Sequence, residues 1–164
     1  PAEQAGPLIR PVQPRFAELA AQTPAAPCWT VMAAFGERLP APDILRESGP
    51  IGWAARNSAK PGRTGPEAWV VQAGPDWSRV NMEREPTEIV PLLLKALADR
   101  LGKTLPPCLS ATVHRWRYAR AGAEGSGALW DAELRLGLCG DWLLGPRVEA
   151  AWLSGRRLAA AIIG

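Results

Sequence analysis

The sequence predicts an α+β protein in which several strands with one long helix are followed by a single α/β-type strand–loop–helix unit. Apolar runs bounded by Gly or Pro predict three strands, at 28–35, 51–57 and 67–73. An apolar stripe predicts a helix over 86–102. The last unit is an apolar strand over 134–139, a Gly-Asp loop, and a helix over 147–163.

The long helix has clear signals at both ends. Pro86 and Thr87 begin it, and Gly102 ends it. Its stripe has helical spacing and consists of Ile89, Leu92, Leu93, Ala96, Leu97 and Leu101. We expect one helical turn at 16–21, a connecting segment at 77–84, and an extended segment at 109–118.

The C-terminal unit cannot be a complete α/β domain. A lone strand–loop–helix cannot bury both faces of a parallel strand, so it indicates the last unit of a doubly wound domain whose other strands lie elsewhere. We therefore expect two parts, a sheet with one long helix and this C-terminal unit.

Composition excludes several classes of protein. The longest helical apolar patch, 158–163, is too short to span a bilayer, so no membrane partner is expected. The net charge is only +3 and contains no block of like charges. Three widely spaced cysteines predict neither a disulfide framework nor a metal site, and we interpret them as small buried residues of a cytoplasmic protein. The basic and aromatic run at 114–118 is too short to indicate nucleic-acid binding.

The segment 138–155 carries the strongest chemical signal. Gly140 lets a ligand approach the backbone beyond a strand end, and Asp141 places a carboxylate there. The N–H groups of 148–150 begin the final helix, where free amides and the helix dipole favour a negative ligand atom. A plain strand–turn–helix with a Gly-Asp turn is the alternative interpretation.

This segment resembles the C-terminal flavin motif of FAD-dependent amine oxidases, in their renalase-like, NAD(P)/FAD-dependent branch. Further collinear matches to that branch are 1–5, 27–29, 53–63, 69–73, 77–78 and 114–119. The resemblance implies an oxidoreductase that transfers hydride to FAD from a reduced amine or a dihydronicotinamide-type dinucleotide. It also implies that 1–110 form a substrate-binding domain with an antiparallel sheet and that 111–164 return to the FAD-binding domain.

The resemblance also implies site residues. Asp141 should bind the ribityl or pyrophosphate region of FAD, and the amides of 148–150 should face the flavin pyrimidine edge. The implied cofactor-binding set is Gly140, Asp141, Trp142, Arg147, Val148, Glu149 and Ala150. The implied substrate-binding set is Trp53, Asn57 and Gln72.

Other interpretations of these residues stay open. Asn57 could be a turn residue and Gln72 an exposed polar residue of a strand. Lys60 and Arg63 could clamp a phosphate or lie in a solvated loop. His114 is expected to be a hydrogen-bonded structural residue.

One departure from the family pattern is large. The sequence contains no strand followed by G-x-G-x-x-G, the motif that holds the ADP part of FAD in these enzymes. We therefore expect this chain to need an N-terminal FAD-binding half from outside its 164 residues. A non-catalytic substrate-binding module that lacks a cofactor site is the alternative.

Overall fold

The computed structural model describes residues 1–164 and contains two compact units. Unit 1 comprises residues 1–26 and 118–164, and unit 2 comprises residues 27–117. This division differs from the expected one at 110/111. The first 26 residues pack with the C-terminal segment because Phe16 shares an apolar cluster with Trp142 and Leu143.

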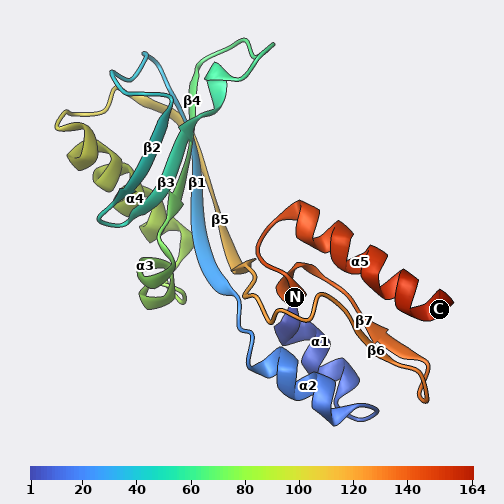
Figure 1. Cartoon of the computed structure of the whole chain (residues 1–164). Coiled ribbons are helices and arrows are strands. Elements are labelled where there is room, and N and C mark those ends of the chain that lie inside the picture. Colours follow the sequence, from blue (N-terminus) through green and yellow to red (C-terminus); the bar gives the residue numbers. More distant parts are fainter. The chain divides into compact units, whose positions relative to one another are not determined.

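Unit 2 is built on a sheet with the strand order β2-β3-β4-β1-β5 (Figure 1). The strands are β1 (Ala26–Phe35), β2 (Ile44–Ser48), β3 (Ile51–Arg56), β4 (Glu67–Ala73) and β5 (Cys108–Arg120). The pairs β1/β4, β2/β3 and β3/β4 are antiparallel. The predicted antiparallel sheet is therefore confirmed, whereas β2 was not predicted.

Helix α4 (Pro86–Leu101) covers one face of this sheet, as Figure 1 shows. Its stripe is buried at four positions, but Leu92 is exposed, so the predicted stripe is one residue too wide. Gly102 ends the helix with a φ of 63°, a left-handed conformation that glycine adopts without a Cβ clash. A six-residue helix, α3 (Pro75–Val80), lies where a connecting segment was expected.

Strand alternation gives the sheet two distinct faces. Trp29, Val31 and Phe35 of β1 point into the core with Trp69 and Val71 of β4. The intervening residues therefore point away from this core, and we call the face that they form the open face.

Unit 1 contains a short hairpin between helices (Figure 1). Strands β6 (Leu129–Asp131) and β7 (Leu136–Leu138) form an antiparallel pair. Helices α1 (Ala2–Ile9) and α2 (Pro14–Ala21) contribute to one apolar cluster with the hairpin. Helix α5 (Val148–Ile163) packs on β6 and on a short 3-10 helix, η2 (Asp141–Leu143).

The C-terminal strand differs from its prediction. We expected a buried strand over 134–139, but β7 has three residues and all of them are half-buried. Its partner β6 is antiparallel and was not predicted, because β6 has only three residues. The molecule is of the α+β class. None of its helices combines the length and the apolar character that crossing a membrane requires.

Candidate functional site

The turn between β7 and α5 is built around Gly140. Its N–H group donates to the Ser154 hydroxyl of α5 at 2.9 Å, which fixes the turn against the helix. A Cβ on residue 140 would lie 2.9 Å from the Trp142 ring, so a larger residue would displace that ring. Glycine is therefore required here by close packing.

Asp141 begins η2 and directs the chain toward α5. Its backbone carbonyl accepts the N–H groups of Leu144 and Gly145, at 2.9 and 2.6 Å. The Asp141 carboxylate is half-buried and makes no hydrogen bond or ion pair within the chain. An acceptor of this kind, with its backbone held and its side chain unpaired, is able to bind hydroxyl or N–H groups of a ligand.

The start of α5 supplies two free amides. Arg147 is the residue that precedes the helix, and its carbonyl accepts the Ala150 N–H at 3.0 Å. The N–H groups of Val148 and Glu149 have no acceptor within the chain. Two of the three predicted amides are thus free, and the third is used by the first turn of the helix.

The other predicted cofactor-binding residues have different surroundings. Trp142 is 3% exposed in the apolar cluster with Phe16 and Leu143, so its side chain serves packing. Arg147 and Glu149 are exposed and form no ion pair. Ala150 is buried beneath the helix.

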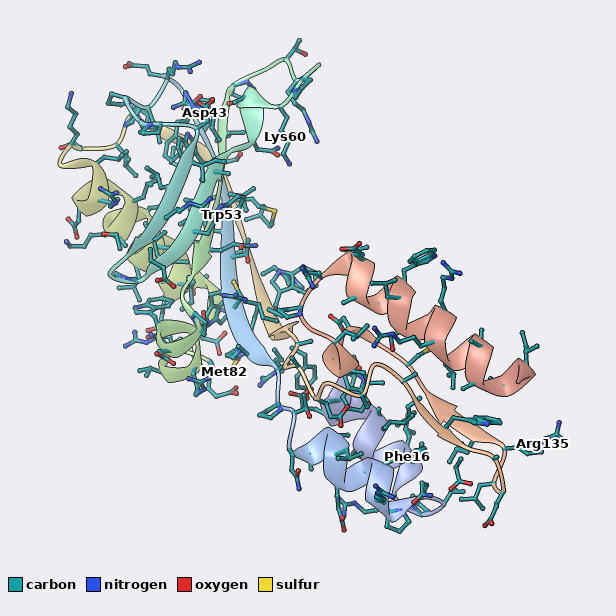
Figure 2. All side chains as sticks on the ribbon, viewed as in Figure 1. Phe16, Asp43, Trp53, Lys60, Met82 and Arg135 are labelled. Atoms are coloured by element: carbon teal, nitrogen blue, oxygen red, sulfur yellow. The ribbon has the colours of Figure 1, made fainter.

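Two of the three predicted substrate-binding residues are direct neighbours on the open face of unit 2. Trp53 of β3 pairs directly with Gln72 of β4, and Gln72 pairs with Thr30 of β1. Asn57 follows Arg56, the last residue of β3, and begins the 3-10 helix η1 (Asn57–Ala59). The amides of Asn57 and Gln72 are half-buried and make no hydrogen bond within the chain. Figure 2 shows Trp53 on the sheet.

A buried ionic network fixes the end of β3 next to Asn57. The Arg56 guanidinium lies 3.4 Å from Glu67 and 3.1 Å from Asp43. It also donates to the carbonyls of Leu39 and Ala41, at 3.0 and 2.7 Å.

The Glu67 carboxylate joins the neighbouring loops to this network. It accepts the Leu39 N–H, the Trp69 indole N–H and the Ser58 hydroxyl, at 3.1, 2.8 and 3.2 Å. The loops after β1 and β3 are therefore held at one end of unit 2, where Figure 2 labels Asp43 and Lys60.

Sequence reasoning missed several residues of these two regions. The buried pair of Arg56 and Glu67 gave no signal, because two charged residues eleven positions apart show no pattern. Thr30 and Arg46 could have been found, since strand alternation places them on the face of Trp53 once β2 is recognised. Ser154, which accepts the Gly140 N–H, was not among the predicted site residues.

Two further expectations need correction. Only Cys28 is buried, whereas Cys108 and Cys139 are exposed because they lie on an edge strand and in a turn. The His114 side chain makes no hydrogen bond; its ring lies 4.3 Å from that of Trp116 in a T-shaped contact. Lys60 is exposed and forms no ion pair, which agrees with the solvated-loop interpretation.

No protein-family model matches this chain. No group of three or more His, Cys, Asp or Glu side chains is arranged to hold a metal ion. The candidate site therefore rests on two sets of unpaired polar groups, one at the start of α5 and one on the open face.

The groups at the start of α5 fit part of a flavin nucleotide. An unpaired carboxylate suits sugar-like hydroxyls, and two free amides at a helix start suit a carbonyl oxygen that becomes more negative on reduction.

Proposed function

We propose that this chain is the C-terminal part of an FAD-dependent oxidoreductase of the amine-oxidase and renalase type. The observation that supports it most is an unpaired Asp141 carboxylate on η2, which packs against α5, the helix that begins with the free amides of Val148 and Glu149. In this proposal Asp141 binds the ribityl or pyrophosphate region, and the two amides bind the pyrimidine edge of the flavin. The short β6/β7 hairpin would extend a doubly wound sheet supplied from outside these residues.

The open face of unit 2 is the proposed substrate-binding surface. The unpaired amides of Gln72 and of Asn57, at the end of β3, orient the substrate by hydrogen bonds, and Trp53 provides an apolar surface beside Gln72. The bound flavin would supply the hydride-acceptor chemistry. No strong side-chain base is required on the protein, and none lies next to Gln72 on the paired strands.

The Gly-Asp turn gives a sharp test of this proposal. We expect protein purified as its complete natural gene product to carry FAD, seen as flavin absorption bands and as FAD released on denaturation. Asp141→Ala should lose most of this FAD with little change in the circular dichroism spectrum, because the carboxylate makes no hydrogen bond or ion pair within the chain. Asp131→Ala is the control, since that carboxylate lies in the same unit and has internal partners.

Two results would count against the proposal. One is a wild-type protein that neither retains FAD nor acquires it on reconstitution. The other is an Asp141→Ala protein with unchanged FAD content and affinity. A flavin-free protein that still binds small ligands on unit 2 would favour the non-catalytic binding module.

A further inference from the structure

A row of four side chains crosses the open face of unit 2. Arg46 of β2 pairs directly with Trp53 of β3, Trp53 with Gln72 of β4, and Gln72 with Thr30 of β1. Directly paired residues of antiparallel strands point to the same face, so these four side chains lie side by side. The adjacent row is mostly apolar and consists of Ile44, Ala55, Val70 and Met32.

Arg46 is the charged end of this polar row. Its neighbour Leu45 is 4% exposed in the core, which confirms that Arg46 points to the opposite face. The Arg46 guanidinium is exposed and makes no hydrogen bond or ion pair within the chain. It therefore keeps all five N–H donors available to a ligand.

These four strands carry two acidic residues, Glu47 of β2 and Glu67 of β4. Glu47 follows Arg46 and is exposed, but it makes no ion pair within the chain. Glu67 points to the core side, where it lies 3.4 Å from Arg56. The Arg46 guanidinium thus has no ion-pair partner within the chain. Its charge favours a negative group on whatever occupies the face.

The spacing of the row sets the size of the occupant. Neighbouring strands lie roughly 5 Å apart, so a group over Gln72 and a group at Arg46 are separated by roughly 10 Å. This is the length of a flat ring joined to an anionic group through a short linker or a sugar. The apolar row and the Trp53 ring suit the flat ring, and the unpaired Gln72 amide suits its polar edge.

We propose that Arg46 binds the anionic group of a ring-bearing ligand on the open face, and so selects phosphate- or carboxylate-bearing substrates. This inference rests on the proposed function, since it names the substrate chemistry of the same surface. Trp53 and Gln72 hold the ring, and Arg46 discriminates by charge. Arg46 contacts no residue assigned to the flavin.

Matched probes test the charge preference directly. The wild-type protein is titrated with nicotinamide mononucleotide and nicotinamide riboside, which differ by a phosphate. It is then titrated with indole-3-acetate and indole-3-acetamide, which differ by a carboxylate charge. Binding is followed by NMR at the Trp53 indole N–H, which is assigned from a Trp53→Phe variant. The two pairs distinguish phosphate from carboxylate as the preferred anion.

We expect the anion-bearing member of at least one pair to bind roughly tenfold more tightly than the member without the anionic group at low salt, as a charge-assisted hydrogen bond allows. Arg46→Gln should remove this preference and leave binding of the member without the anionic group unaffected, and Arg46→Lys should keep part of the preference. Arg100→Gln is the matched control, because Arg100 is an exposed arginine on α4, on the other side of the sheet. That variant should bind like wild type.

The inference is overturned if neither anion shifts the Trp53 signal saturably, if Arg46→Gln keeps the preference, or if Arg100→Gln loses it equally. FAD content of Arg46→Gln, measured in parallel, separates the two proposals. Normal FAD with a lost anion preference supports both of them. An anion preference in a protein that binds no FAD supports the Arg46 assignment and removes the flavin proposal.

Discussion

The buried pair of Arg56 and Glu67 allows a quantitative prediction for the substitution Glu67→Gln. The side chains are 1% and 7% exposed, and the charged atoms lie 3.4 Å apart. Breaking a buried ion pair typically costs about 3–5 kcal/mol, because the remaining charge loses its partner. Arg56 keeps Asp43 at 3.1 Å and two backbone carbonyls, which lowers the expected loss of unfolding free energy to about 2 kcal/mol.

Urea denaturation followed by tryptophan fluorescence measures this loss. Asp99→Asn is the control, because its partner Lys95 and Asp99 itself are both more than half exposed. An exposed pair contributes about 0.5 kcal/mol or less. If Glu67→Gln lowers the free energy of unfolding no more than Asp99→Asn does, the network around Arg56 does not hold the end of β3.

A double-mutant cycle tests the same pair more closely. Glu67→Gln leaves the buried Arg56 guanidinium without one of its two carboxylate partners. Adding Arg56→Met removes that buried charge. The double variant should therefore lose less stability than the sum of the two single losses. Additive losses would show that the two side chains act independently.

Three further predictions concern other parts of the chain. Hydrogen bonds from the Arg117 guanidinium hold the pKa of the Glu83 carboxyl below its ordinary value. The stabilising effect of these hydrogen bonds is present above the ordinary carboxyl pKa and is lost as the pH falls through the lowered pKa of Glu83. An NMR titration of Glu83 should therefore show a higher midpoint pH in the Arg117→Met variant than in the wild type. Gly102→Ala should cost about 1 kcal/mol in urea denaturation because its φ is 63°, and an unchanged midpoint would refute that strain. The exposed apolar residues of α5 include Trp152 and Ile162, so light scattering should show self-association of the wild-type protein. Trp152→Glu should reduce this self-association. Unchanged self-association in the variant would show that another surface is responsible.

Local signals predicted the main elements of unit 2. The long helix had a proline at its start, a glycine at its end and a regular apolar stripe, and all three features are present in α4. The strands over 51–57 and 67–73 had apolar cores between Gly and Pro, and they form β3 and β4. Such features are encoded within a few residues, so sequence inspection detects them.

Short elements and long-range packing were not predictable in this way. The helix α1 contains Pro7, which argues against a helix, yet Ala2 and Ile9 are buried in the cluster with Trp142. The hairpin strand β6 has three residues, too few to show alternation. The union of residues 1–26 with 118–164 depends on contacts between distant segments, which no local pattern records.

The candidate site was predicted in part for the same reason. The resemblance placed Trp53 and Gln72 in one substrate-binding set, and the structure shows them as direct neighbours on one face. Arg46 was missed because β2 was missed. The burial of the Trp142 ring was not predicted, since a position in a motif does not show what surrounds a side chain.

The most direct test of the account is a crystal structure of the FAD-loaded protein. The account predicts the flavin pyrimidine edge within hydrogen-bond distance of the Val148 or Glu149 N–H, and the Asp141 carboxylate on the ribityl or pyrophosphate region. A flavin bound elsewhere, with Asp141 and the start of α5 still without a ligand, would contradict the central claim.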